Sequence, residues 1–447
     1  MTTSVNAGED TSQRKQLGCS GMTVLIAGGG ISGLALALSC HQANIPFQVF
    51  EATPMLNPLG VGINLQPSAV RELYALGVQD QLDDVGIQTR DFGMYTKRGL
   101  HIWTEPRGLH AGYHWPQYSV HRGKFHMMLY NEVLRRAGPD AVRTGWKATG
   151  FDTQDDRVIL HLVDGQMHTQ SVEGSVLIGA DGIHSALRKQ IAPFEGAPCW
   201  EGAVLYRGTT LAKAPLSGAS MALVGHASRR FVTYPISQAD PETGLSTINW
   251  IAELNFGTDT AFDKGNYAQN VPLEKFAHHF KDFKFDWLDC PSLIAGAEEV
   301  FEYPMVDRDP LDRWTHGRMT LMGDAAHAAY PVGSNGAGAG IIDARKLVAA
   351  FLKHGLSTTA LQTFEDEMRP LTNRMVLTNR GAGPDEILNT VEDRCDGYFD
   401  HIHDVISEEE MAQHAAFYKR IAGTGISDTN ERPDIVPEGA QFTQQSL

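Results

Sequence analysis

The chain has 447 residues, enough for one large domain or two to three ordinary ones, and 42% hydrophobic with 20% charged residues indicates a globular protein with a sizeable core. A formal net charge of −16 argues against nucleic acid and anionic membranes as non-specific partners, because both would be repelled. Five scattered cysteines, none in a Cys-x-x-Cys pair, predict neither a disulfide framework nor a zinc site. We expect a cytoplasmic protein without a membrane span or a metal, either a monomer or a homodimer.

The first structured region begins after a polar segment. Residues 1–20 lack apolar periodicity and predict a disordered tail. An apolar run at 23–27 then predicts a strand, residues 31–43 predict a helix, and residues 47–50 predict a second strand. Together they form a β-α-β unit of about thirty residues, which is the setting that a dinucleotide fingerprint requires.

The turn of this unit has the spacing Gly-x-Gly-x-x-Gly, at Gly28, Gly30 and Gly33, and its second strand ends at Glu51. We expect the first two glycines to let the backbone approach a pyrophosphate at the helix N-terminus. The third lets helix and strand pack closely, and Glu51, about twenty residues on, can accept a hydrogen bond from a ribose hydroxyl. The complete unit predicts dinucleotide binding.

Strand-like patterns dominate the middle of the chain. Short aromatic runs broken by glycine and proline occupy residues 92–120, and longer alternating runs follow at 202–211, 230–236 and 246–254. This alternation predicts a sheet with one covered face and one face toward a cavity or solvent. Residues 124–136 have helical spacing instead.

A second strand-turn-helix segment has the pattern Asp-Gly-x-x-Ser-x-x-Arg, at Asp181, Gly182, Ser185 and Arg188. An acid in this turn can orient backbone amides or hold a ribose. Taken alone, the segment favours a helix start with an acidic cap over a ligand site.

A third segment ends a strand at Gly323-Asp324 and continues through a glycine-rich turn at 330–340 into a helix. An aspartate at the end of a strand can hold a polyol such as a ribityl chain. Free amides at the following helix N-terminus would stabilise an anionic reduced flavin. We expect the nearby His327 to pack beneath the loop.

The C-terminal part of the sequence is helical in pattern. Residues 337–354 and 359–380 have the strongest helical spacing, and Pro370 is expected to interrupt the second helix. Residues 407–410 form a capping box that starts a last helix. Residues 423–447 lack a pattern and predict disorder.

The three motifs, in this order and spacing, resemble the single-component class A flavoprotein aromatic hydroxylases over residues 22–380. Shorter segments at 118–123, 205–208 and 303–311 are similar to the phenazine hydroxylase branch of that family. The resemblance implies an α/β chain of two domains, a Rossmann-like FAD-binding domain with a parallel sheet and a three-stranded crossover, and a substrate domain with a mixed or antiparallel sheet.

The expected domains are discontinuous in sequence. The FAD-binding domain takes residues 21–91, 121–197 and 301–380, the substrate domain takes 92–120 and 198–300, and residues 381–447 form a helical, acidic C-terminal segment.

The resemblance also implies which residues hold FAD. Gly62 would lie by the flavin, Arg122 would reach the phosphate or ribityl region, and Asp324 would hold the ribityl hydroxyls. Asp181 with Gly182 would serve both FAD and the nicotinamide cofactor. The full set of expected cofactor residues is Gly28, Gly30, Gly33, Glu51, Gly62, Arg122, Asp181, Gly182, Asp324, Pro331, Gly336 and Ala337, of which Pro331 would lie beside the ring and the last two would donate amides to it.

In this family NADH or NADPH transiently visits and reduces a tightly but non-covalently bound FAD. O2 then adds to form a flavin C4a-hydroperoxide that oxygenates an electron-rich ring. The resemblance therefore implies a monooxygenase that hydroxylates a small aromatic or N-heteroaromatic substrate. Arg207 and Tyr234 lie on strands expected to cover the flavin, where related enzymes have an arginine that pairs with a phenolate and a tyrosine that hydrogen-bonds the substrate. An interdomain ion pair is the alternative role for Arg207, and packing is the alternative for Tyr234.

The same residues bear on other possible functions. The same flavin chemistry could lead to decarboxylative, dearomatising or ring-opening oxidation, because the substrate decides that outcome. A flavin halogenase is opposed by the absence of a Trp-x-Trp-x-Ile-Pro motif, and enzymes with two nucleotide folds are opposed by the missing second fingerprint. A non-catalytic FAD-fold binding scaffold is opposed by Asp324, which has a purpose only if the flavin ring is bound.

Overall fold

The computed structural model describes residues 23–58, 60–259, 269–381, 386–413 and 425–443. The expected tail at 1–20 lies outside them. A five-stranded parallel sheet forms the centre of the first region, in the order β21-β12-β1-β2-β8. Its strands are β1 (Val24–Ala27), β2 (Phe47–Glu51), β8 (Val142–Thr144), β12 (Val176–Gly179) and β21 (Met319–Leu321). Every residue of β1, β12 and β21 is buried, as expected for strands covered on both faces.

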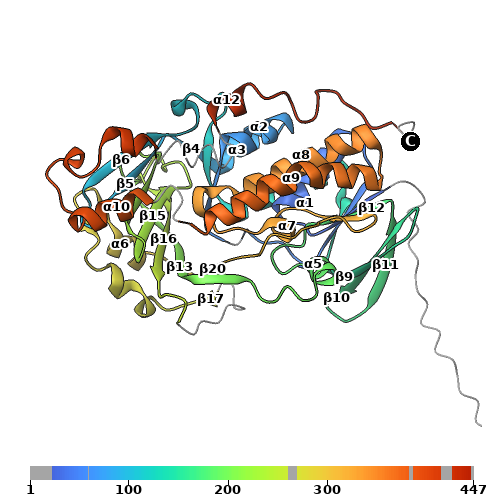
Figure 1. The fold of residues 1–447 in the computed structure, drawn as a ribbon, viewed down its shortest axis with the longest axis horizontal. Helices are drawn as coiled ribbons and strands as arrows, with labels where there is room; N and C mark the ends of the chain where they lie inside the picture. Colours follow the sequence, from blue (N-terminus) through green and yellow to red (C-terminus); the bar gives the residue numbers. More distant parts are fainter. Residues whose placement is uncertain (1–22, 59, 260–268, 382–385, 414–424, 444–447) are drawn as a thin grey trace, which may run out of the picture.

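Helices cover this sheet. α8 packs on α1, α9 packs on α8, and α4 packs on α1, so that α8 and α9 cross the middle of Figure 1 in front of α1. The bounds are α1 (Ile31–Gln42), α4 (Arg122–Ala137), α8 (Gly336–His354) and α9 (Thr358–Asn379).

The expected interruption at Pro370 is wrong, because α9 runs through it. Apolar residues of α9 such as Phe364 and Met368 are buried, and this packing keeps the helix together across the missing N–H.

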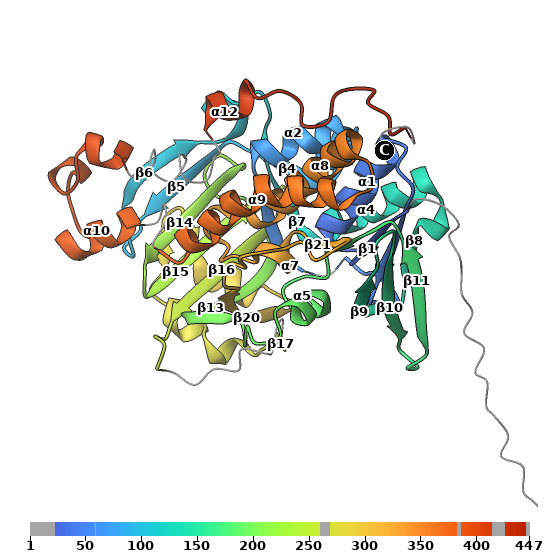
Figure 2. The ribbon, with the colours of Figure 1, turned by 45° about the vertical axis from the view of Figure 1, so that its right-hand side comes forward.

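A three-stranded antiparallel sheet connects β8 to β12, as the Rossmann-like prediction with a three-stranded crossover requires. It consists of β9 (Trp146–Thr153), β10 (Val158–Asp164) and β11 (Thr169–Gly174), which project at the right of Figure 2. The short α5 (Ala186–Ile191) follows β12 and packs on β9.

The second region is an eight-stranded sheet in the order β17-β20-β13-β16-β15-β14-β5-β6. Only the β14–β5 pair is parallel among these described strands, so the predicted mixed sheet is confirmed. The strands are β5 (Asp91–Tyr95), β6 (His101–Pro106), β13 (Cys199–Ala212), β14 (Ser220–His226), β15 (Arg229–Pro235), β16 (Ser246–Asn255), β17 (Gln269–Asn270) and β20 (Val300–Asp307). One face packs on a cluster of aromatic residues that includes Phe276, Phe280 and Phe283, and the other face turns toward the parallel-sheet region.

A small antiparallel sheet, β3-β7-β4, lies between the two regions, beside α2 and α3. Its elements are β3 (Gly62–Leu65), α2 (Pro67–Ala75), α3 (Gln79–Val85), β4 (Gly86–Thr89) and β7 (Gln117–His121). The structure thus pairs β7 with β3 and β4 rather than with the eight-stranded sheet, although the sequence assigned most of its residues to the substrate domain. Elements in the remaining connections are β18 (Lys284–Phe285), β19 (Leu288–Asp289), α6 (Cys290–Ala295) and α7 (Asp324–His327).

The C-terminal segment differs from the prediction. α10 (Glu386–Cys395) packs on β14, and the hydroxyl of Ser407 accepts a hydrogen bond from the N–H of Glu410, as the capping box predicts. Residues 425–443, expected to be disordered, instead run from α12 (Ile426–Asn430) along the top of both views to the C-terminus. The prediction of disorder is therefore wrong for these residues.

Side-chain contacts explain the order of this segment. Arg71 of α2 donates to the carbonyl of Thr429 at 2.9 Å and pairs with Asp434 at 2.8 Å, while Val436 is buried in the main core. The N–H of Phe442 donates to the carbonyl of Ala43 at 2.8 Å. Single residues make these contacts without a periodic apolar pattern, so the sequence carried no helical or strand signal for them.

Candidate active site

The carboxyl ends of β1, β12 and β21 are neighbours in the parallel sheet, and each is followed by one of the three motif turns. A Cβ atom added to Gly28, where φ is +113°, would lie 2.2 Å from the carbonyl oxygen of Ala180 in the second motif. A Cβ on Gly33 would lie 2.0 Å from the carbonyl oxygen of Gly28. Glycine is therefore required at both positions by the close approach of strands and helix.

Space opens beyond these tight contacts. An added Cβ would meet no atom within 4 Å at Gly30, Gly182 or Gly336, the first and last of which lie at the N-termini of α1 and α8. Glu51 bends back over the first turn, where its carboxylate accepts hydrogen bonds from the N–H groups of Gly29 and Thr53, both at 2.7 Å. The helix N-termini thus present free backbone amides to this space, the arrangement that binds anionic groups.

The second motif caps the N-terminus of α5. The carboxylate of Asp181 accepts hydrogen bonds from the hydroxyl of Ser185 at 2.5 Å and from the N–H of Ala186 at 2.8 Å, at the start of α5. Burial raises the pKa of Asp181, and these hydrogen bonds oppose the rise. The interpretation of this segment as an acidic helix cap is confirmed, while its expected contact with FAD or the nicotinamide stays a prediction.

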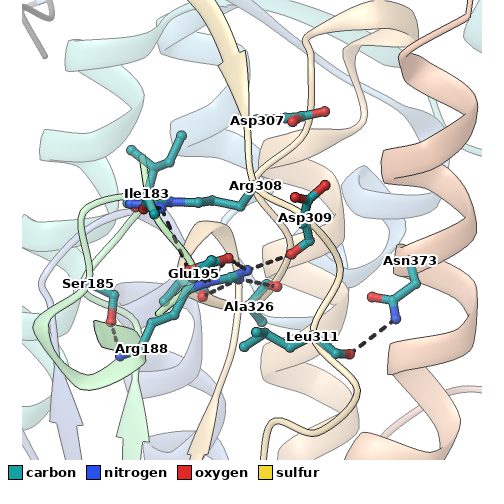
Figure 3. Close-up of polar contacts among 12 residues, drawn as sticks. Ile183, Ser185, Arg188, Glu195, Asp307, Arg308, Asp309, Leu311, Ala326 and Asn373 are labelled. Atoms are coloured by element: carbon teal, nitrogen blue, oxygen red, sulfur yellow. Dashed lines mark hydrogen bonds and ion pairs between the residues drawn. The ribbon is translucent and has the colours of Figure 1, made fainter. Parts of the chain in front are cut away.

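Arg188, the last residue of the second motif, ties that motif to the third. Its guanidinium donates to the carbonyls of Ala325 and Ala326 at 3.0 and 2.8 Å and to the carbonyl of Asp309 at 2.6 Å (Figure 3). The same guanidinium pairs with Glu195, and only 2% of Arg188 is exposed. Four partners around a buried cation make this a fixed anchor for α7.

The third motif contains a buried ion pair that the sequence analysis missed. Asp343 of α8 accepts hydrogen bonds from the N–H of Gly323 at 2.9 Å and from Nε2 of His327 at 2.7 Å. Burial alone would lower the pKa of His327, but the facing carboxylate outweighs burial and raises it. His327 packs beneath the loop as predicted, whereas Asp324 between these anchors is exposed. An acid in the otherwise small and apolar start of α8 was the available signal for Asp343.

The predicted catalytic residues lie together on the eight-stranded sheet. The Arg207 guanidinium donates to the carbonyl of Gly62 at 2.7 Å and hydrogen-bonds Tyr234, which also contacts Asn64. The N–H of Gly62 donates to Oδ1 of Asn249 at 2.6 Å. β3 is therefore held by side chains of β13, β15 and β16, so Gly62, Arg207 and Tyr234 form one cluster, while their roles at the flavin stay predictions.

The electrostatics of this cluster follow from its burial. Tyr234 is 2% exposed, and burial raises its pKa to about 12 although Arg207 works against the rise, so the phenol is protonated at neutral pH. Burial also lowers the pKa of Arg207, and the nearby positive charge of Arg122 adds to that effect. Nε of Arg207 and Nδ2 of Asn249 are enclosed without a hydrogen-bond partner. An isolated amide within an apolar strand was the sequence signal for Asn249.

A cavity with about 1460 Å³ of space between atoms, part of it open to solvent, adjoins this cluster. One wall is the inner face of the eight-stranded sheet, and the opposite wall includes the turn from Pro331 to Asn335 that begins α8. Apolar side chains dominate the sheet wall; they are Phe92, Met94, Leu205, Met221, Leu223, Val232 and Ile251. We call this space the central cavity. It joins the Tyr234 side of the substrate sheet to the glycine-rich turn of the third motif.

A family model described as an FAD binding domain matches residues 21–378. Over 361 residues the chain is 39% identical to phenazine 1,6-dicarboxylic acid hydroxylase PhzS of Lysobacter antibioticus, a match that covers 80% of this chain and 89% of that protein. The chain belongs to the class A flavoprotein hydroxylases. It is an FAD-dependent monooxygenase of the aromatic hydroxylase type, and the resemblance to the phenazine hydroxylase branch is confirmed.

Further comparisons agree. The chain is 28% identical over 395 residues to 6-hydroxynicotinate 3-monooxygenase of Bordetella bronchiseptica, covering 84% of this chain and 94% of that one. Its fold matches HpxO of Klebsiella pneumoniae complexed with FAD and uric acid, with a TM-score of 0.68, 22% identity and coverage of 91% and 97%. A salicylate hydroxylase substrate complex gives a TM-score of 0.67 at 20% identity, with coverage of 92% and 98%.

Within the described ranges, no group of three or more His, Cys, Asp and Glu side chains is arranged to hold a metal ion. None of the helices in the described part of the chain is both long enough and apolar enough to cross a membrane.

Proposed function

We propose that this enzyme uses NADH or NADPH and O2 to hydroxylate an aromatic or N-heteroaromatic carboxylic acid in the central cavity. One observation carries the proposal: the cavity is bounded on one side by the sheet face with Tyr234 and on the other by the turn from Pro331 to Asn335. A substrate in it would lie between polar side chains and the turn expected beside the flavin. The carboxylic acid follows the name of the Lysobacter antibioticus relative, which acts on a phenazine dicarboxylic acid.

The residues around the motif turns fit FAD. The open space at Gly30 suits the pyrophosphate, the exposed Asp324 suits the ribityl chain, and the free amides at Gly336 and Ala337 suit the polar edge of the isoalloxazine ring. The enclosed and unpartnered Nε of Arg207 also suits a polar ligand atom. When bound, FAD supplies the redox chemistry, accepting electrons from the nicotinamide and activating O2.

The chain's own residues orient the substrate and exclude water. Tyr234 keeps its proton at neutral pH, because its pKa is about 12, and therefore donates a hydrogen bond to a substrate oxygen or nitrogen. Arg207 holds the carbonyl of Gly62 and the tyrosine, and its positive charge favours an ionised ring hydroxyl nearby. The apolar sheet wall keeps the reacting centre dry, which protects oxygen activation from wasteful reaction with water.

The test begins with purified holoenzyme and its visible spectrum, followed by anaerobic NADH and NADPH titrations with and without phenazine and pyridine carboxylic acids. We expect flavin bands that bleach faster when an acid is present, and a product one oxygen atom heavier by mass spectrometry. Product without oxygen insertion, or loss of CO2, would instead favour decarboxylative or ring-opening oxidation. A protein that binds no FAD after reconstitution would refute the proposal and favour a binding scaffold.

Arg207→Ala tests the site itself. We expect hydroxylation to slow by at least about 100-fold while FAD affinity changes little, because the guanidinium contacts β3 and Tyr234 rather than the dinucleotide turns. Arg229→Ala is the matched control, since this arginine pairs with Asp282 on the opposite face of the same sheet. An Arg207→Ala enzyme with wild-type rate and coupling would remove Arg207 from the site.

A further inference from the structure

The central cavity contains polar groups that the proposed reaction does not use. Three side chains that line it each have an enclosed polar atom without a hydrogen-bond partner: Nε1 of Trp103, Nε of Arg107 and Oε1 of Gln117. They come from β6, from the turn after it and from the start of β7. Buried polar atoms are almost always paired in folded proteins, so an unpaired set around one cavity points to a polar partner, a ligand or water, in that cavity.

These three side chains border one apolar patch. The guanidinium of Arg107 lies over the ring of Phe92, 5.1 Å from its centre, and the Gln117 amide contacts the sulfur of Met221 at 3.3 Å. Phe92 and Met221 are direct partners in the β5–β14 ladder, and Trp103 pairs with Met94, two residues further along β5. The unpaired atoms therefore gather at the β6–β7 side of the cavity. We call these three residues the polar wall.

Gln117 is the most deeply buried residue of the polar wall. It is 1% exposed, and its amide has only a weak sulfur contact on one side and no partner on the other. Rotation of the amide by 180° would turn its NH2 group toward the cavity at the cost of that single contact. Trp103 and Arg107 can only donate. The wall can thus present three donors to one ligand group, which suits a carboxylate.

The wall is at a suitable distance from the predicted reaction centre. The residue pairs Ala222–Thr233 and Met221–Phe92 place Phe92, which lies under the guanidinium of Arg107, two strands away from Tyr234. Trp103 lies one strand further away, on β6. Adjacent strands are about 4.8 Å apart, so the separation from Tyr234 is about 10 Å for the Arg107 side of the wall and about 14 Å for Trp103. A fused ring system can span that distance, with one end at Tyr234 and a substituent at the polar wall.

The ion pair between Arg230 and Glu253 also lines the cavity but is less suited to a ligand than Arg107. Arg230 binds the carboxylate of Glu253 through Nε at 3.0 Å and through Nη2, directly across the β15–β16 ladder. Arg107 meets Glu105 through Nη2 at 3.0 Å, and its Nε has no hydrogen-bond partner. Arg230 is therefore the control position against which Arg107 is compared in the test.

We propose that Trp103, Arg107 and Gln117 form a subsite that binds a carboxylate on the aromatic substrate and thereby sets both specificity and the ring position presented for oxygenation. This inference rests on the proposed function, because it assumes that the aromatic substrate occupies the central cavity. It assigns the polar wall to binding rather than to the oxygen-transfer step.

The test uses FAD-loaded enzyme and two probes of the same ring system, phenazine-1-carboxylate and phenazine. Binding is measured as the change in the flavin spectrum without NAD(P)H, so no turnover is needed. Gln117→Met and Trp103→Phe remove a polar atom with little change of volume. We expect each to raise the Kd of the acid about tenfold and that of phenazine less than about twofold. Arg107→Gln should likewise raise the Kd of the acid much more than that of phenazine, whereas Arg230→Gln should not weaken the acid selectively.

Several results would overturn the subsite. Equal weakening of both probes would mean that the wall only packs against the ring, and acid-selective weakening in Arg230→Gln alone would assign the carboxylate to the other ion pair. Failure of the wild-type enzyme to bind the acid would also overturn it. If the wild-type enzyme makes hydroxylated product but the polar-wall variants keep its preference for the acid over phenazine, the subsite is contradicted and the proposed function stands. If the variants lose that preference but the wild-type enzyme makes no oxygenated product, the subsite stands and the proposed function is contradicted.

Discussion

Replacing Asp343 by Asn tests whether a buried ion pair fixes the third motif. The carboxylate is fully buried and accepts hydrogen bonds from the N–H of Gly323 and from His327. Hydrogen bonds to a charged group contribute about 1.5–3 kcal/mol each, and breaking a buried ion pair costs about 3–5 kcal/mol. Because Asn keeps the shape and one acceptor, we expect Asp343→Asn to lower the free energy of unfolding by about 3 kcal/mol.

The pH dependence of this loss has a definite sign. The pKa of His327 in the folded protein is raised above its ordinary value of 6.5. The ion pair therefore contributes its full stability below pH 6.5, and that contribution is lost as the pH rises through the folded pKa. The difference between wild type and Asp343→Asn should thus be largest in mildly acidic buffer and should shrink in alkaline buffer.

Urea unfolding of FAD-free protein at a series of pH values measures this difference directly. Glu367→Gln is the control, because Glu367 pairs with Lys346 between α9 and α8 but is 48% exposed on its side chain, and an exposed pair contributes less than about 1 kcal/mol. The reasoning is refuted if Asp343→Asn behaves like this control, or if its destabilisation grows with pH.

Three further substitutions test other contacts. Gly33→Ala should reduce the FAD content of purified protein strongly, because the added Cβ would lie 2.0 Å from the carbonyl oxygen of Gly28 and force the turn open; full FAD content by absorbance would contradict this. Asp324→Ala should weaken FAD binding about 100-fold in a fluorescence titration through the loss of a charged acceptor, and wild-type affinity would remove its ribityl role. Asn430→Ala should destabilise the protein by about 1–2 kcal/mol, measured by urea unfolding, because its side chain bonds two backbone groups of the 112–114 turn; no change would mean that the C-terminal segment does not hold that turn.

Local pattern was enough to predict the first β-α-β unit of the parallel-sheet region, whereas the rest of that region followed from the family resemblance. The glycine spacing at Gly28, Gly30 and Gly33 requires a strand before it and a helix after it, and the structure has both. The C-terminal residues 425–443 could not be predicted in this way. Their order depends on contacts such as Arg71 with Asp434, which join positions more than three hundred residues apart and leave no local period.

The candidate site was predictable only where its residues belong to motifs. Arg207 and Tyr234 could be named through the family resemblance, and the structure brings them together around Gly62. The roles of Asn249 and Gln117 could not be predicted, although the isolated amide marks Asn249 in its strand, because these roles depend on the register between strands and on which face each strand presents. That register is set by the pairing of the whole eight-stranded sheet.

The structure also gives a physical reason why the second and third motifs occur together. Arg188 holds the carbonyls of Ala325 and Ala326 (Figure 3). Asp343 holds the N–H of Gly323 and the ring of His327. Asp324 lies between these two anchors and is the exposed residue of a short, otherwise buried helix. Loss of either anchor is therefore expected to loosen the position of its carboxylate. The Arg of one motif and the Asp of the other are thus parts of a single positioning device.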